Sequence, residues 1–209
     1  MESSDPELNA RYRNLCATVG HLFICFGRFE GMLTAMLKLH LGSRMSGEKM
    51  SVEAVALSSA IYGSMRFRAA RDIIKRIMKT EGTPKPAMDF ALKVFEQVGH
   101  IEDLRDRIAH HAVVPAYKGA EEYWQVTDAM STKDIREPKV YVFSEEAVVK
   151  AALDLIVAGD RLGGTVVGPK LFADSDFDVS PPPWLYRPSM LKLVPQNKLR
   201  SPLGPSPQR

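Results

Sequence analysis

The sequence predicts a mainly α-helical protein: an antiparallel bundle of about four long helices, with a two-stranded β ribbon inserted between the third and the fourth. Three observations lead to this fold class. Apolar residues recur every three or four positions through most of the chain, which is the period of a helix face. Two short β-branched and aromatic runs interrupt that period. Prolines gather near the C-terminus and predict an extended tail.

The first predicted helix runs from about Leu8 to Leu41. Its apolar residues alternate between spacings of four and three, a pattern that joins helices in bundles. They are Leu15, Val19, Leu22, Phe26, Phe29, Leu33 and Met36. Gly42 follows as a C-terminal stop signal.

The second and third helices are separated by a cluster of breaker residues, Glu81–Pro86. The second helix is predicted from the N-cap residue Ser51 to about Lys79. The third runs from about Ala87 to His110 and again carries apolar residues at threes and fours.

After the third helix the period changes. Tyr123–Thr127 and Val140–Phe143 are read as the two strands of the ribbon. Ser144 then caps a fourth helix that ends near Gly163. We therefore expect a helical bundle over residues 1–167 and a basic, Pro-rich tail over 168–209 that is extended or disordered.

Composition excludes several classes of protein. Hydrophobic residues make up 45% and charged residues 25%, which is ordinary for a globular chain. No apolar run approaches the roughly 20 residues that span a bilayer, and the N-terminus lacks a secretory signal, so we expect no membrane contact. Cys16 and Cys25 form no disulfide framework, and a cytoplasmic location is the expectation. The net charge of +3 is too small to indicate a nucleic-acid partner by itself. It is, however, the sum of a near-neutral body and a basic tail.

The common cofactor motifs are absent. The chain has no Walker-type phosphate loop and no nucleophile elbow. His21 and Cys25, four residues apart, would need a third ligand to bind a metal, and ordinary packing beside the core is the reading we favour. Neither a cofactor nor a metal is expected.

The end of the third helix carries the most chemistry. Glu102, Asp106 and His110 share a helix face, where a carboxylate could fix the tautomer of His110. Arg105 lies five residues before His110, about 140° round an ideal helix. Both side chains therefore reach one site only near a frayed helix end or across a dimer. A solvated helix end, with His110 and His111 at the negative end of the dipole, is the structural alternative.

This stretch resembles a known family. Arg105-Asp106-Arg107-Ile108-Ala109-His110 matches the R-x4-6-H motif of HEPN domains, which also place a polar residue directly after the arginine. Those domains are helical bundles with the motif near the end of the third long helix. The resemblance covers about residues 8–165 by architecture and the motif alone by residue identity. It implies a homodimer that brings two motifs together, and a metal-independent endoribonuclease that uses the RNA 2′-hydroxyl and leaves a cyclic phosphate and a 5′-hydroxyl.

The resemblance also assigns roles. His110 would be the general acid/base, because imidazole titrates near neutrality. Arg105 would hold the scissile phosphate with its fixed fork of donors, and Asp106 would orient the site, although asparagine is frequent in the family at that position. His111 is a rival imidazole. Glu30 either faces the cleft or is an ordinary surface residue.

A basic stripe on the second predicted helix is a candidate RNA contact. Arg68, Arg71, Lys75 and Lys79 follow at spacings of three and four. A solvated helix face is the alternative. Tyr123, Trp124 and Tyr141 could stack on bases, or pack the ribbon onto the bundle.

Two functions therefore stay open within the resemblance. One is a dimeric HEPN-like endoribonuclease, a toxin or phage-defence effector that an antitoxin would control. The other is a non-catalytic HEPN-like module that binds RNA or nucleotide or acts as a scaffold. Outside the resemblance, a helical scaffold whose tail docks a partner through its prolines is a third hypothesis.

Overall fold

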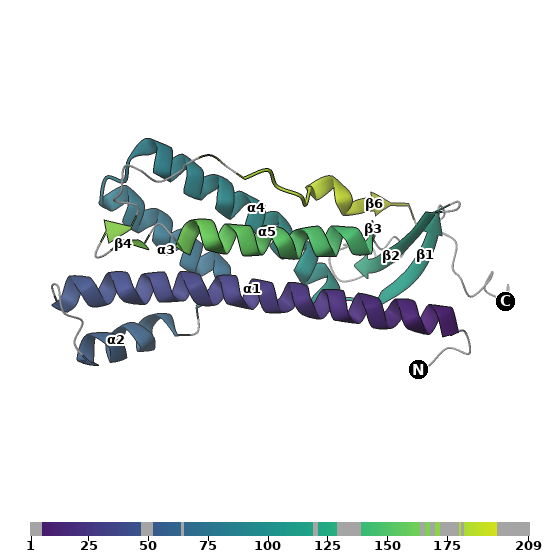
Figure 1. Cartoon of the computed structure of the whole chain (residues 1–209), viewed down its shortest axis with the longest axis horizontal. Coiled ribbons are helices and arrows are strands. Elements are labelled where there is room, and N and C mark those ends of the chain that lie inside the picture. Colours follow the sequence, from purple (N-terminus) through teal and green to yellow (C-terminus); the bar gives the residue numbers. More distant parts are fainter. Residues whose placement is uncertain are drawn as a thin grey trace. The chain divides into compact units, whose positions relative to one another are not determined.

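The computed structural model describes residues 6–46, 52–63, 65–118, 121–128, 139–163, 166–167, 170–171, 180 and 182–195. They form a mainly helical structure with a small antiparallel sheet, as predicted (Figure 1). The helices are α1 (Pro6–Ser46), α2 (Val52–Tyr62), α3 (Phe67–Thr80), α4 (Lys85–His110) and α5 (Glu145–Gly163), with a 3-10 turn η1 (Pro188–Met190). None of these helices is long and apolar enough to cross a membrane.

The strands form two sheets. The larger contains β1 (Val113–Lys118), β2 (Glu121–Asp128), β3 (Lys139–Phe143) and β6 (Lys192–Val194), and all neighbours are antiparallel. The smaller pairs β4 (Val166–Val167) with β5 (Lys170–Leu171).

The chain divides into two compact units. The sheet unit contains Met1–Phe23, Gly99–Leu153 and Leu185–Arg209, and the helical unit contains Ile24–Val98 and Asp154–Trp184. Both are described only over the residues given above. Helices α1, α4 and α5 each contribute one part to either unit.

The long second helix predicted from Ser51 to Lys79 is wrong, because the chain breaks between α2 and α3. Gly63 ends the first piece: its N–H donates to the Ser59 carbonyl at 2.8 Å, and a Cβ at this position would lie 2.4 Å from that oxygen. Arg66 is extended (φ −82°, ψ 159°), which starts α3 in a new direction. Ser51 itself lies outside the described residues.

The break lets Phe67 enter the core of the helical unit. Its ring lies 6.0 Å from Phe26 and Phe29 and 6.5 Å from Phe95, centroid to centroid, and its side chain is fully buried. Ala70, Ile74 and Met78 continue the buried face of α3. Burial of this aromatic cluster explains why α3 packs although its other positions are mostly charged.

The helices of this unit are not arranged as a simple antiparallel bundle. Glu30 bonds Phe67, and farther along the same two helices Arg44 contacts Glu81, so α1 and α3 run in the same direction. Phe29 and Met32 approach Gly159 and Gly163 in turn, so α5 also runs parallel to α1. Helix α4 runs the other way, because a short turn joins it to α3. A parallel α1 and α3 require a returning segment, and α2 lies between them in the chain.

The predicted two-stranded ribbon is larger than expected. The two predicted strands lie within β2 and β3, which pair in the register Trp124↔Phe143 and Val126↔Tyr141. Sequence patterning missed β1, which holds Pro115 but pairs with β2 along its whole length. It also missed β6, which comes from the segment assigned to the tail and pairs with β3.

Residues 185–195 of the C-terminal segment belong to the sheet unit. Tyr186 is almost fully buried, and its burial, followed by the nearby Asp103 carboxylate, raises its pKa to about 12. The boundary predicted at residue 167 stays a prediction, and residues 196–209 lie outside the described part of the chain.

Candidate functional site

The R-x4-H motif lies at the C-terminal end of α4, in the sheet unit. The helix continues through His110, a bend follows at His111, and β1 begins at Val113. Because the backbone stays helical over the motif, Arg105 and His110 leave the helix about 140° apart. The structure shows no frayed end over the motif that would bring the two side chains together.

The Arg105 guanidinium is braced within the sheet unit. Its Nη1 donates to Oδ1 of Asp106, and its central carbon lies 5.9 Å from the centroid of the Phe23 ring. The Arg105 side chain is 18% exposed and that of Asp106 is 35% exposed. Asp106 therefore holds the guanidinium of Arg105 in place.

The two histidines differ in accessibility. His110 is exposed on the last residue of α4, and His111 is half-buried. Along the face shared by Glu102, Asp106 and His110, Glu102 is buried and the face becomes steadily more exposed toward the helix end. His110 is thus the imidazole that a large ligand can reach most readily.

The second arginine of the motif has a structural role that spacing alone did not indicate. The Arg107 guanidinium carbon lies 3.7 Å from the centroid of the Tyr141 ring in β3. Its positive charge also acts on the buried Tyr186, where it lowers the phenol's pKa against the larger effect of burial. Arg107 therefore joins α4 to the sheet and to the C-terminal segment. Tyr141 packs under it, as the packing alternative expected.

The ribbon aromatics are also used in packing. Trp124 is buried, its ring meets Tyr12 edge-on at 5.1 Å, and Arg11 lies over it at 5.6 Å. Lys192 lies 5.9 Å from the ring of Tyr123. These contacts fasten α1 and β6 to the sheet.

The predicted basic stripe lies on α3, in the helical unit. Arg68 and Lys79 are exposed, and Arg71 and Lys75 are half-buried beside the core face. One carboxylate accompanies them: Arg71 Nε donates to Asp72 Oδ1 at 2.9 Å. This hydrogen bond, helped by the charges of Arg71, Lys75 and Arg76, lowers the pKa of Asp72. The stripe is therefore a cationic surface with a single ionised acid in it.

The site residues form two candidate surfaces. Arg105, Asp106 and His110 lie in the last two turns of α4, and His111 follows, all in the sheet unit. Arg68, Arg71, Lys75 and Lys79 line one side of α3 in the helical unit.

Glu30 makes a contact that neither of its two expected roles included. Its Oε1 accepts a hydrogen bond from the Phe67 N–H at 2.8 Å, which satisfies a donor that the first turn of α3 would otherwise leave unpaired. Sequence inspection misses this contact because the two residues are far apart in the chain.

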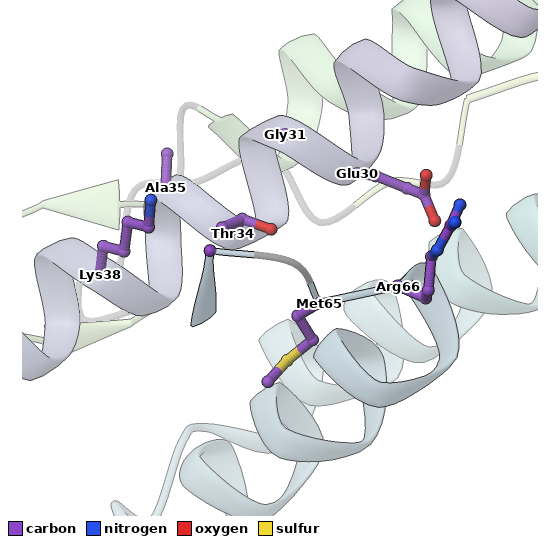
Figure 2. A pocket seen from close by; sticks show the side chains of 8 residues that line it. Glu30, Gly31, Thr34, Ala35, Lys38, Met65 and Arg66 are labelled. Carbon is purple, nitrogen blue, oxygen red and sulfur yellow. The ribbon is translucent and has the colours of Figure 1, made fainter. Parts of the chain in front are cut away.

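Beside Glu30 lies a pocket of about 510 Å³ that sequence analysis did not anticipate. Its lining residues come from α1 and from the connection between α2 and α3 (Figure 2). They are Glu30, Gly31, Thr34, Ala35, Lys38, Gly63, Met65 and Arg66. Of these, Gly63, Met65 and Arg66 come from the connection between α2 and α3.

Metal-ligand geometry is absent from the described residues, where no three His, Cys, Asp or Glu side chains are placed to hold one ion. Cys25 is buried in the core, and burial raises the pKa of its thiol. This environment fits the packing role preferred for Cys25 from the sequence.

No protein-family model, no curated protein and no solved structure matches the chain.

Proposed function

We propose that the protein is a HEPN-like, metal-independent endoribonuclease that acts as a homodimer. The observation that carries the proposal is the end of α4, where an oriented Arg105 and an exposed His110 occupy one unbroken helix terminus. In this proposal α1, α3, α4 and α5 are the long helices of a HEPN-like bundle, with the motif at the end of the third. A toxin or phage-defence role, with an antitoxin or tail-binding partner, belongs to the same proposal.

The chemistry follows from the two side chains. A neutral His110 imidazole takes the proton of the RNA 2′-hydroxyl, and the 2′-oxygen attacks the adjacent phosphorus. The bond from phosphorus to the 5′-oxygen breaks, and an imidazolium returns a proton to that oxygen. Arg105 stabilises the negative charge that builds on the non-bridging oxygens. The products are a 2′,3′-cyclic phosphate and a 5′-hydroxyl, with no water consumed.

The dimer follows from the helix geometry. Since Arg105 and His110 diverge by about 140° on one helix, a phosphate held by one is turned away from the other. A second copy would supply the missing partner, so that each site uses Arg105 of one chain and His110 of the other. The basic face of α3 would hold the RNA backbone through Arg68, Arg71, Lys75 and Lys79.

The primary test is RNA cleavage in EDTA by the wild type and by single variants. We expect His110→Ala to lose about 10²–10⁴-fold in rate and Arg105→Ala about 10²–10³-fold. His21→Ala, an exposed histidine on α1, is the matched control and should keep the wild-type rate. His111→Ala decides between the two imidazoles. Equal cleavage by all variants would overturn the assignment.

A mixing experiment tests the composite site. Arg105→Ala and His110→Ala chains are each inactive alone, but a mixed dimer contains one site with both residues intact if the two come from different chains. Equal mixing followed by subunit exchange should therefore recover about a quarter of the wild-type activity. No recovery, with exchange confirmed by mass spectrometry of tagged chains, would show that a single chain supplies both residues.

One observation favours a second candidate, a non-catalytic module that binds RNA or serves as a scaffold. Arg105 already contacts Asp106 and lies over Phe23, so its guanidinium is partly used within its own chain. If the wild type binds RNA without cleaving it, and Asp106→Asn does not produce cleavage, this candidate replaces the enzyme.

A further inference from the structure

The pocket between α1 and the α2–α3 connection has polar groups at both ends. Figure 2 shows Glu30 and Arg66 with their charged ends toward one another at one end, and Lys38 at the other. Glu30 and Lys38 are eight positions apart on α1, which corresponds to about 12 Å along the helix axis. The Thr34 hydroxyl lies between them.

The net charge of the lining is positive. Lys38 and Arg66 contribute two cations, and Glu30 contributes one carboxylate. That carboxylate accepts the Phe67 N–H at 2.8 Å and so faces the positive end of α3, where the helix dipole offsets part of its charge. The ligand that this lining favours is therefore an anion.

Small residues make room for such a ligand. Gly31, Ala35 and Gly63 line the pocket without side chains that would fill it. Gly63 cannot be replaced freely, since a Cβ there would lie 2.4 Å from the Ser59 carbonyl oxygen. At Gly31, by contrast, a Cβ would meet nothing within 4 Å, so this position opens directly into space.

We propose that this pocket binds a short stretch of single-stranded RNA, with backbone phosphates at Lys38 and at Arg66. Lys38 and Arg66 lie at opposite ends of the pocket (Figure 2), so they would contact two different phosphates of a strand rather than one. A cavity of about 510 Å³ admits a single strand and is too small for a duplex. The inference rests on the proposed function, because the strand would belong to the ribonuclease's substrate.

The test uses a fluorescent twelve-nucleotide RNA with 2′-O-methyl groups throughout. The methyl group blocks attack by the 2′-oxygen, so fluorescence anisotropy of the wild-type protein reports binding without cleavage. Gly31→Leu should fill the pocket and weaken binding about tenfold or more, in line with loss of a strand-binding groove. Gly27→Leu is the matched control, since a Cβ at Gly27 also meets nothing within 4 Å and Gly27 does not line the pocket.

The charged ends are tested separately. Lys38→Gln and Arg66→Gln should each weaken binding and lower the slope of log affinity against log salt by about 1, as expected for one lost phosphate contact. Lys93→Gln, an exposed lysine on α4, should leave the slope unchanged. Unchanged affinity in Gly31→Leu would overturn the proposal, and so would equal competition by adenosine monophosphate and by the oligonucleotide, which would mean a small-ligand pocket.

The outcomes separate this inference from the proposed function. If Gly31→Leu binds the oligonucleotide like the wild type while the wild type cleaves ordinary RNA through His110, the strand site is wrong and the ribonuclease stands. If Gly31→Leu loses binding while the wild type cleaves no RNA, the strand site stands and the ribonuclease is wrong. Circular dichroism of both glycine variants confirms that each is folded.

Discussion

The sheet unit and the helical unit use their positive charges differently. In the sheet unit several described cations lie over aromatic rings: Arg11 lies over Trp124, Arg107 over Tyr141 and Lys192 over Tyr123. In the helical unit an apolar cluster around Phe67 forms the core, Arg71 lies 5.7 Å from the centroid of the Phe67 ring, and most of the other charged residues of α3 are exposed. Among the described residues, cations over rings are therefore more frequent in the sheet unit, whereas α3 carries an exposed basic face in the helical unit.

This difference changes how charge is read from the sequence. Counting basic residues made this part of the chain a candidate surface for RNA, and the burial pattern of α3 agrees with a charged outer face. The same count would have included Arg107, although its guanidinium lies over the Tyr141 ring and its charge acts on Tyr186. Under the proposed function, losing a cation that lies over a ring should cost stability in the sheet unit, and losing an exposed cation of α3 should cost RNA binding in the helical unit.

The largest effect is expected at Phe67. Phe67→Ala removes a fully buried ring from contact with three other aromatic rings, and we expect it to lower the free energy of unfolding by about 3–5 kcal/mol. Urea denaturation followed by circular dichroism measures the loss. Leu39→Ala, a half-exposed position on α1, is the control and should cost well under half as much. Equal losses would mean that the Phe67 cluster is not the core of the helical unit.

The next effect is a pH dependence from Tyr186 in the sheet unit. Burial and Asp103 raise its pKa from 10.0 to about 12, so the folded chain holds this proton more tightly than the unfolded chain does. The contribution is present below pH 10 and is lost as the pH rises through 12, a fall in the free energy of unfolding of about 2–3 kcal/mol. Other groups titrate in this range too, so the quantity to measure is the difference between the wild type and Tyr186→Phe. Stability curves that stay parallel from pH 9 to 12 would contradict the prediction.

Much of the fold was predictable where its signals are local. The end of α4 was placed at His110 because the apolar period stops there, and α5 was placed after Ser144 because a cap and two acids stand together. The break after α2 has a different origin. After the break, the start of α3 is capped by the Glu30 carboxylate, which reaches the Phe67 N–H only in the folded chain. No short stretch of the sequence contains both residues. In the same way, β6 forms because it pairs with the edge of β3, which lies far from it in the sequence.

The candidate site was predictable to a similar extent. Helical spacing correctly set Arg105 and His110 on diverging sides of one helix, since α4 remains helical through both. Spacing did not distinguish Arg105 from Arg107, because the ring of Tyr141 that holds Arg107 comes from a strand far along the chain. The pocket beside Glu30 was missed for the same reason. One side comes from α1 and the other from the connection between α2 and α3, and two of its lining residues are glycines, which have no side chain that could signal a site.

The contrast between the units is sharpened by removing one arginine from each. Arg107→Ala should cost about 2 kcal/mol of unfolding free energy, because it removes a partly desolvated cation from the face of Tyr141 along with its packing. Arg76→Ala, at an exposed position on α3, should change stability by no more than about 0.5 kcal/mol. Urea midpoints of the two variants measure the difference. Arg107→Met, which keeps the apolar stem, should recover part of the loss, and full recovery would show that packing and not charge is what Tyr141 requires.

The smallest effect compares how a helix begins in each unit. In the sheet unit, the Ser144 hydroxyl accepts the Ala147 N–H at 3.2 Å, a local cap of α5. In the helical unit, Glu30 accepts the Phe67 N–H at 2.8 Å from another helix. Ser144→Ala and Glu30→Ala should each cost about 1 kcal/mol, measured by urea denaturation.

The conservative variant at Glu30 separates two contributions to that cost. Glu30→Gln keeps an oxygen that can accept the Phe67 N–H but removes the negative charge from the positive end of α3, so it should lose only about 0.3–1 kcal/mol. High salt should narrow its difference from the wild type, because the charge–dipole part is screened and the hydrogen bond is not. If Glu30→Gln is as unstable as Glu30→Ala at every salt concentration, the carboxylate acts by charge alone. The start of α3 would then be set by the turn at Gly63 and by the burial of Phe67 rather than by a cap from α1.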